Sequence, residues 1–164
     1  MLLALVIAVA SFAAVIFFRP LLLMPAATPL QAFAPALRWD ILLLVCLALN
    51  IAVIARHRFV TPADLDGSGL AEGTARIRLY QATLQNTLEQ TVLALSTHVV
   101  WALTMPRPWQ GVIAVAAILF FIGRLLFWRG TASGATTRAF GFALTFYPSL
   151  LMILVLAVHF VFPL

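Results

Sequence analysis

The sequence predicts an all-α integral membrane protein with four or five membrane-spanning helices in one domain. Hydrophobic residues make up 64% of the 164 residues, and charged residues only 9%. This composition is typical of membrane proteins and not of soluble domains of the same size. The hydrophobic residues form runs that are long enough to cross a bilayer, and short segments rich in Arg, Pro and Gly separate these runs.

The basic, thiol and imidazole side chains exclude several function classes. All ten basic residues are arginines, and they gather at the ends of the apolar runs, which favours contact with phospholipid headgroups and not with nucleic acid. The single cysteine, Cys46, lies inside an apolar run, so we expect a buried and unreactive thiol. His57, His98 and His159 lack the spacing of metal ligands. We therefore expect no bound metal and no nucleic-acid partner.

The first apolar run, residues 1–18, predicts a membrane helix that is not cleaved as a signal peptide. No basic residue precedes this run, and it is longer than the hydrophobic core of a signal peptide. Residues 21–37 contain Pro25, Pro29 and Pro35, so we expect a linker at the membrane surface or partly inside it, and not a straight span. Residues 39–54 predict the next helix, with Asp40 at its N-terminal end, where the helix dipole favours a carboxylate.

A loop is predicted over residues 59–73, where turn-forming Pro, Asp, Gly and Ser residues are concentrated. Its fragment DLDGSG, residues 64–69, resembles the start of a calcium-binding loop but lacks the later ligands and the final glutamate. A solvated turn is therefore favoured over a calcium site. Asp64 could be a catalytic acid or a cap of the loop, and the loop cap is the favoured interpretation.

The helix predicted over residues 76–104 carries polar side chains that are expensive at membrane depth. At 100° per residue they form one stripe, which contains Arg78, Gln81, Gln85, Glu89 and Ser96. Asn86 lies beside the stripe and within reach of Glu89. We expect the stripe to face a polar interior, and the opposite side to face lipid or neighbouring helices; that side contains Thr83, Thr87, Thr91 and Ala94. Asn86 and Glu89 form either a binding site or a polar clamp between helices.

Two further helices are predicted over residues 109–127 and 138–161, which are again mostly apolar. Gly111 and Gly123 favour close packing of the first of them, and Pro148 is expected to kink the second. Arg124 and Arg138 are either ligand-binding residues or anchors that reach the lipid headgroups.

The arginines also predict an orientation in the membrane. If the loops after residues 54 and 128 lie on one side, that side carries seven arginines, and these are Arg56, Arg58, Arg76, Arg78, Arg124, Arg129 and Arg138. The other side carries three: Arg19, Arg38 and Arg107. Because cytoplasmic loops are enriched in arginine, we expect the first side, and with it the polar half of helix 76–104, to face the cytoplasm. We expect Trp39, Trp101 and Trp109 to form an aromatic belt on the other side.

Three segments, QATLQNTLEQTVLAL, GRLLFW and RAFGFALTFYP, resemble the MAPEG family, the membrane-associated proteins of eicosanoid and glutathione metabolism. The family motif places Asn and Glu three residues apart, like Asn86 and Glu89. Arg124 matches a basic residue near the cytoplasmic end of the third family helix. Arg138 and Pro148 match an Arg that opens the fourth helix and a Pro ten residues later. The resemblance covers residues 39–164, so residues 1–38 are an extra N-terminal membrane helix and Pro-rich linker.

The resemblance implies an antiparallel four-helix transmembrane bundle that forms a homotrimer, here as a bacterial-type member in the inner membrane. It implies a glutathione transferase or peroxidase that acts on small hydrophobic electrophiles, with glutathione bound between subunits near the cytoplasmic surface. Arg138 would stabilise the glutathione thiolate, because a nearby guanidinium favours the charged form of a thiol. The peptide part of glutathione would be held by Asn86 and Glu89, and its carboxylates by Arg78 and Arg124.

The sequence departs from the family pattern at several binding positions. Ala82 stands where family enzymes usually carry Arg, and Gln90 where a Tyr often follows the Glu. Phe127 and Trp128 replace tyrosines late in the third helix. A second interpretation therefore stays open, a non-catalytic interaction or scaffold protein of the same fold.

Overall fold

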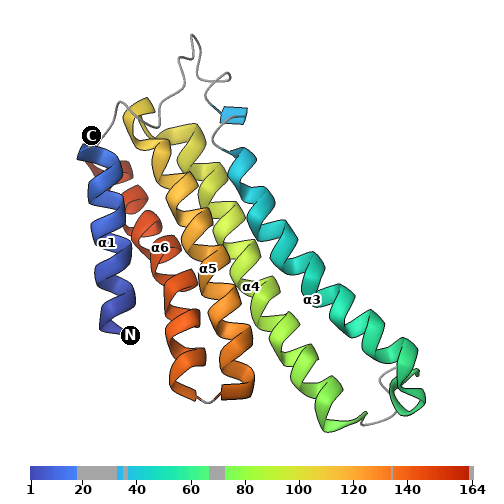
Figure 1. Cartoon of the computed structure of the whole chain (residues 1–164). Helices are drawn as coiled ribbons and strands as arrows, with labels where there is room; N and C mark the ends of the chain where they lie inside the picture. The colour runs from blue at the N-terminus through green and yellow to red at the C-terminus, as the bar shows by residue number, and fades with distance from the viewer. Residues whose placement is uncertain (18–32, 35–36, 67–72, 134, 163–164) are drawn as a thin grey trace.

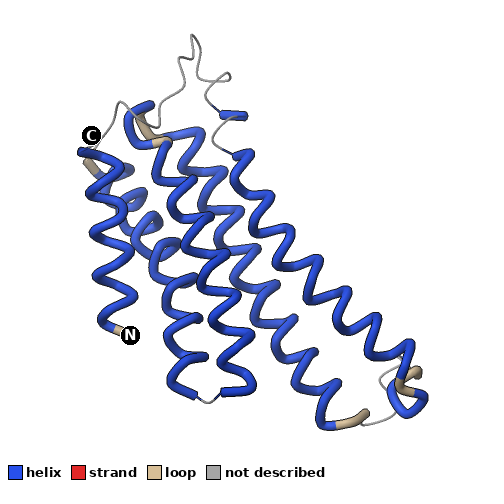
Figure 2. The backbone as a smooth tube through the Cα atoms, viewed as in Figure 1, coloured by secondary structure: helices blue, strands red, loops and turns tan. Residues whose placement is uncertain are grey.

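The computed structural model describes residues 1–17, 33–34, 37–66, 73–133 and 135–162, without the side chains of residues 132–137. Most of this part is helical, as Figure 2 shows, and no strand occurs among the described residues. The α-helices are α1 (Leu2–Phe17), α3 (Ile41–Val60), α4 (Ala75–Thr104), α5 (Gly111–Ser133) and α6 (Ala135–Val161). Short 3-10 helices precede α3, α4 and α5, and these are η2 (Arg38–Asp40), η3 (Pro62–Asp64) and η4 (Arg107–Trp109).

The helices α3 to α6 run alternately up and down beside one another, and α1 lies against α5 and α6 (Figure 1). This arrangement confirms the predicted all-α bundle with one additional N-terminal helix. Among the described residues, three segments are long and apolar enough to cross a membrane: Arg38–Val60, Arg107–Thr131 and Arg138–Val161. α4 has 30 residues and runs along the same bundle. Asn86 of α4 contacts Arg124 of the span Arg107–Thr131, so the polar part of α4 around Asn86 lies at the depth of the apolar spans.

Two helices continue further than the sequence predicts. α3 ends at Val60 and not near residue 54, so Arg56, His57 and Arg58 belong to the helix. α5 ends at Ser133 and not at residue 127. Arginine is a good helix former, and a positive charge near a helix C-terminus interacts favourably with the helix dipole. The predicted surface linker falls mostly outside the described residues, as do residues 67–69 of the DLDGSG fragment.

α5 and α6 approach each other closely where they cross at Gly123 and Gly141. A Cβ atom added to Gly141 would lie 2.4 Å from the backbone N of Phe127 and 2.7 Å from the backbone O of Gly123. One added to Gly123 would lie 2.7 Å from Cγ2 of Thr145. Only glycine lets the two backbones approach this closely. The predicted close packing at Gly123 is therefore confirmed, and Gly141 is its partner on α6.

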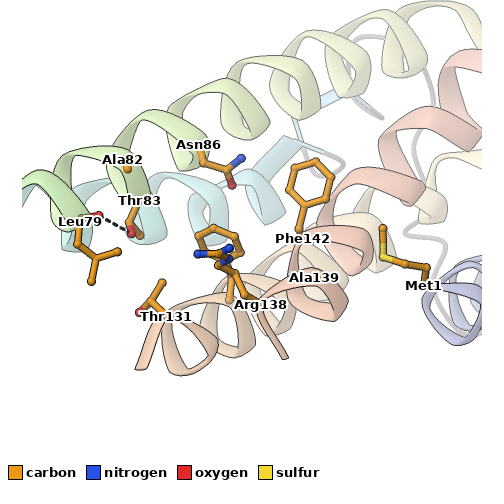
Figure 3. Close-up of a pocket in the computed structure, with 10 residues that line it drawn as sticks. Met1, Leu79, Ala82, Thr83, Asn86, Thr131, Arg138, Ala139 and Phe142 are labelled. Carbon is orange, nitrogen blue, oxygen red and sulfur yellow. Dashed lines mark hydrogen bonds between the residues drawn. The ribbon is translucent and has the colours of Figure 1, made fainter. Parts of the chain in front are cut away.

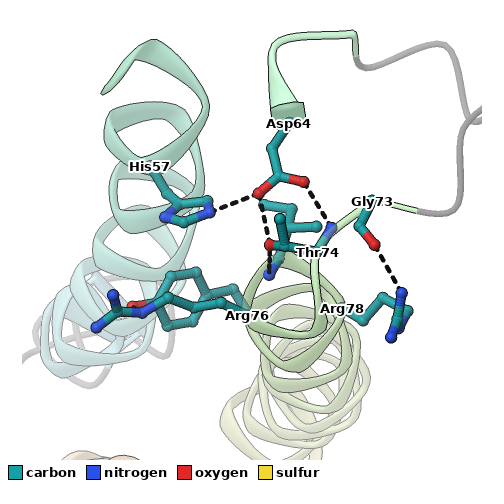
Figure 4. A network of polar contacts seen from close by, with 8 residues as sticks. His57, Asp64, Gly73, Thr74, Arg76 and Arg78 are labelled. Carbon is teal, nitrogen blue, oxygen red and sulfur yellow. Dashed lines mark hydrogen bonds and ion pairs between the residues drawn. The ribbon is translucent and has the colours of Figure 1, made fainter. Parts of the chain in front are cut away.

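The loop between α3 and α4 is closed by Asp64, which is 3% exposed (Figure 4). Its carboxylate accepts hydrogen bonds from the Thr74 backbone N at 2.7 Å and the Thr74 hydroxyl at 2.6 Å, and it pairs with Nε2 of His57 at 2.7 Å. Burial acts to raise the pKa of the Asp64 carboxyl, but these bonds from Thr74 and His57 outweigh it and lower the pKa. Thr74 also caps α4 by accepting from the backbone N of Ile77. The predicted loop-capping role of Asp64 is confirmed.

At the opposite end of the bundle, a buried pair joins Asp40, the last residue of η2 and the N-cap of α3, to α4. Nδ1 of His98 lies 2.5 Å from Oδ1 of Asp40, so the Asp40 carboxylate binds a neighbouring helix and makes no side-chain cap to its own. Trp101 is 1% exposed, and its indole N donates to the backbone O of Trp109. Trp101 is therefore part of the core. The prediction that it belongs to an aromatic belt is wrong, because its ring fills space between helices.

Candidate functional site

The polar core of the bundle is organised by Arg124 of α5, which is 0% exposed. Its Nη1 donates to Oδ1 of Asn86 on α4 at 2.8 Å, with Oγ1 of Thr87 at 3.5 Å. Its Nη2 donates to Oγ1 of Thr145 on α6 at 2.7 Å. One guanidinium thus joins three helices. The interpretation of Arg124 as an anchor for lipid headgroups is wrong, because the side chain is enclosed by the bundle.

The guanidinium of Arg124 is surrounded by neutral groups. The aromatic rings of Phe127 and Phe120 lie 4.6 and 5.7 Å from its guanidinium carbon. No carboxylate pairs with it among the residues that the structure describes, and its buried Nε has no hydrogen-bond partner there. Ring faces and hydroxyl oxygens offset only part of the cost of burying a cation. The surroundings of Arg124 therefore favour binding of an anion nearby.

The network continues from Arg124 to α3. Nδ2 of Asn50 donates to Oγ1 of Thr87 at 3.3 Å and to the backbone O of Cys46 at 3.0 Å. Asn50, Thr87 and Thr145 were not among the predicted site residues. The repeat of threonine at residues 83, 87 and 91 was the available signal, since threonines four residues apart share one face of a helix.

The orientation of α4 differs from the sequence-based expectation. The threonine face points inward and is buried at Thr83, Thr87 and Thr91. The polar stripe points away from the rest of the chain, and all its members are exposed; these are Arg78, Gln81, Gln85, Glu89 and Ser96. The expectation that the stripe faces a polar interior of the chain is therefore wrong. The threonine hydroxyls make burial possible because each donates to a carbonyl four residues earlier in α4.

A cavity of about 510 Å³ lies between α4, α5 and α6 (Figure 3). It is at the end of the bundle where α5 turns into α6, on the side that the arginine distribution predicts to be cytoplasmic. Most of its wall is apolar, and the lining residues are Met1, Leu79, Ala82, Thr83, Asn86, Phe127, Thr131, Arg138, Ala139 and Phe142. Its volume is in the range of small-molecule binding sites.

The cavity brings together two of the five predicted site residues. Asn86 and Arg138 both line it, and Arg124 contacts Asn86 from the core of the bundle. Arg78 instead donates to the backbone O of Gly73 at 2.6 Å, in the loop before α4. Glu89 accepts a hydrogen bond from Gln85 on the exposed face of α4. Neither Arg78 nor Glu89 lines the cavity.

The departures from the family pattern change the wall of this cavity. Ala82 and Phe127 line it at positions where the resemblance places an arginine and a tyrosine. Gln90 is buried inside the bundle, and its Oε1 has no hydrogen-bond partner among the described residues. The wall therefore offers fewer polar contacts, and a larger apolar surface, than the family pattern implies.

The bundle and its cavity define a helical integral membrane protein with a ligand-sized site at one end. The model of the MAPEG family matches residues 34–158, so the chain belongs to the MAPEG family. This match confirms the resemblance found in the sequence, and it begins after α1. No curated protein and no solved structure matches the chain.

Proposed function

We propose that the chain is a glutathione-dependent transferase or peroxidase that acts on small hydrophobic electrophiles from the bilayer. The observation that supports this proposal most directly is the cavity itself, which Asn86 of α4 and Arg138 of α6 both line, with the buried cation of Arg124 bonded to Asn86. Glutathione carries two carboxylates and a thiol, so arginines at such a site stabilise its charged groups.

In this proposal Arg138 holds the thiolate. Its guanidinium lines the cavity and is exposed, so a thiol in the cavity can approach it. A cation beside a thiol lowers the thiol pKa and raises the thiolate fraction at neutral pH. The thiolate sulfur then attacks an electrophilic carbon, whose leaving group takes the electron pair. With a peroxide, it attacks one oxygen, the O–O bond breaks, and the other oxygen leaves with the electron pair and is protonated to an alcohol. The thiol of a second glutathione then attacks the sulfenic sulfur and gives the disulfide and water. Both reactions suit a mostly apolar cavity that accepts hydrophobic molecules.

Asn86 and Glu89 are proposed to hold the peptide part of glutathione. The bond from Arg124 to Oδ1 of Asn86 fixes the amide, so that its N–H group points away from Arg124 and can donate to a peptide carbonyl. Glu89 would accept from the α-amino group, and Arg78 would bind one carboxylate. Arg124, which is enclosed by the bundle and bonded to Asn86, would attract the other carboxylate by its charge. We propose that the cavity faces the cytoplasm of a bacterial inner membrane, as the arginine distribution predicts.

Glu89 and Arg78 lie outside the cavity of a single chain, and we propose that neighbouring copies bring them into it. An exposed carboxylate at membrane depth is expensive unless another protein surface covers it. A homotrimer would cover the polar stripe of α4 and complete each site between two copies. Native mass spectrometry from detergent micelles is expected to show a trimer of the intact chain. A monomer under all mild detergent conditions would contradict this arrangement.

Replacing Arg138 by alanine is expected to abolish the ultraviolet absorbance of bound thiolate, because the group that stabilises the charge is removed. Glutathione is first titrated into the purified protein by calorimetry and then monitored by difference absorbance. Arg56→Ala is the matched control: Arg56 is exposed on α3 and does not line the cavity, so the thiolate absorbance should persist. Unchanged absorbance in Arg138→Ala would reject the assignment of Arg138.

The second candidate is a non-catalytic interaction or scaffold protein of the same fold. It is favoured by the contact between Asn86 and Arg124, which satisfies the Asn86 oxygen inside the chain, and by Ala82 at a position where a binding arginine is expected. No heat of binding at millimolar glutathione, from protein that is folded and assembled, would support the scaffold and contradict the enzyme.

A further inference from the structure

The cavity borders the immediate neighbours of Arg124 but not Arg124 itself. The Arg124 side chain is 0% exposed and does not line the cavity. Two residues contact its guanidinium and also line the cavity. Asn86 accepts a hydrogen bond from Nη1 at 2.8 Å, and the ring of Phe127 lies 4.6 Å from the guanidinium carbon. The cation is therefore one side chain away from the space that a ligand can occupy.

The guanidinium of Arg124 has binding capacity that the bundle does not use. The described hydrogen bonds use Nη1 and Nη2, and the buried Nε has no partner among the described residues. The face of an aromatic ring attracts a cation, but more weakly than a carboxylate that also accepts hydrogen bonds from it. A carboxylate that replaced the ring of Phe127 beside the guanidinium would therefore bind Arg124 more strongly than the ring does.

The side chain of Phe127 can move while its backbone stays in place. A Cβ atom added to Gly141 would lie 2.4 and 2.9 Å from the backbone N and Cα of Phe127, so this part of α5 is held closely against α6. The Phe127 side chain borders a cavity of about 510 Å³, which offers room for its ring. A change between staggered rotamers would therefore move the ring off the guanidinium without moving α5.

The rest of the cavity suits a molecule with an apolar body and one negative charge. Most of the wall is apolar, Arg138 adds a second cation, and no Asp or Glu is among the described lining residues (Figure 3). The hydroxyls of Thr83 and Thr131 donate to backbone carbonyls of their own helices. The polar groups that remain to donate to a ligand are therefore those of Arg138 and Asn86.

We propose that the ring of Phe127 covers an anion subsite on Arg124, which binds the carboxylate of an amphipathic molecule whose apolar part occupies the cavity. The carboxylate binds only when the ring has moved, so binding shifts Phe127 toward the rotamer that uncovers Arg124. The subsite requires a carboxylate and no thiol. It therefore goes beyond the proposed glutathione chemistry and does not depend on it.

The subsite is tested with two probes of the same shape and different charge. These are para-fluorobenzoate, which is an anion at neutral pH, and para-fluorobenzamide, which is neutral. Their dissociation constants are measured by fluorine NMR with the full-length protein in lipid nanodiscs. Phe127→Ala is expected to raise the affinity for the benzoate about tenfold, because a charge-assisted hydrogen bond to Arg124 forms without the cost of displacing the ring. The affinity for the benzamide should rise much less, since it gains only space.

Three further variants separate charge from space. In Arg124→Met, Phe127→Ala should no longer favour the benzoate, because the cation is absent. Phe142→Ala is the matched control: Phe142 also lines the cavity, but it is not one of the rings that lie over Arg124, so both affinities should change by the same factor. Phe127→Leu keeps more of the apolar volume, and a smaller gain for the benzoate alone is expected from it.

Equal gains for the two probes in Phe127→Ala and Phe127→Leu would overturn the proposal, because they would reflect space and not charge. Unchanged benzoate affinity in both variants would overturn it as well, and so would a gain that persists in Arg124→Met. The assay contains no glutathione, so its result is independent of the proposed enzymatic activity.

Discussion

Replacing Asn86 by leucine is expected to destabilise the bundle by about 3 kcal/mol, because it leaves a buried charge short of an acceptor. Nη1 of Arg124 donates to Asn86 at 2.8 Å, and its other acceptor, Thr87, is at 3.5 Å. With Asn86 removed, the strongest acceptor of this N–H group is lost, and neither lipid nor the neighbouring phenylalanine rings supply one of equal strength.

Replacing Arg124 itself is expected to be far less harmful. Arg124→Met removes the cation together with its demand for acceptors. The hydroxyls of Thr87 and Thr145 keep their bonds to backbone carbonyls in their own helices, at 2.8 and 2.7 Å. Buried charges are often replaced by apolar side chains of similar volume at little cost. The change in the free energy of unfolding should therefore stay within about 1 kcal/mol.

The double-mutant cycle of these two changes supplies the control. Unfolding is followed in mixed micelles as the fraction of denaturing detergent rises. In the Arg124→Met background, Asn86→Leu is expected to have almost no effect, because no charge remains to be satisfied. An equal cost of Asn86→Leu in both backgrounds would show that Asn86 stabilises the bundle in some way other than through Arg124.

Gly141→Ala is expected to cost about 3 kcal/mol, although it adds a single methyl group. That methyl carbon would lie 2.4 Å from the backbone N of Phe127 and 2.9 Å from its Cα. Backbone atoms cannot rotate away as a side chain can, so α5 and α6 must move apart. The same movement would lengthen the bond from Arg124 to Thr145, which crosses between these helices, and would change the cavity beside it.

The measurement is again the free energy of unfolding in mixed micelles, with the yield of folded protein as a second readout. Ala157→Leu adds more volume to α6 at an exposed position and should leave stability unchanged. If Gly141→Ala left the free energy of unfolding unchanged, α5 and α6 would be able to move apart at this crossing at little cost, and the expected effect would be contradicted.

The helices of the bundle were predictable because the membrane imposes strict rules on the chain. A backbone in lipid must satisfy its own hydrogen bonds, so long apolar runs can only be helices. The close packing at Gly123 followed from its small size. Asp64 was predicted to cap its loop, since aspartate binds nearby backbone N–H groups readily. The C-terminal ends of α3 and α5 were predicted too early, because Arg56, Arg58 and Arg129 were interpreted as marking the ends of these helices. Arginine is compatible with a helix, and both helices continue past these residues.

The candidate site was predictable only in part. The spacing in the sequence singled out Asn86 and Glu89 as neighbours, but Asn86 faces the cavity and Glu89 the exposed side. Three residues along a helix correspond to 300°, so two such side chains can be close and still serve different surfaces. Thr145 and Asn50 could not be connected to Arg124 from the sequence, because they lie on separate helices and each is an ordinary polar residue.

The sequence by itself determined that this protein is a helical membrane bundle of the MAPEG family, because composition, apolar run length and motif spacing are properties of the linear chain. The tertiary structure alone decided which face of α4 is buried. In a bilayer a polar stripe can be covered by the same chain or by another copy, and periodicity does not distinguish the two cases. The threonine face is the buried one because its hydroxyls are satisfied within α4, and it packs around Arg124, leaving the stripe that contains Glu89 exposed.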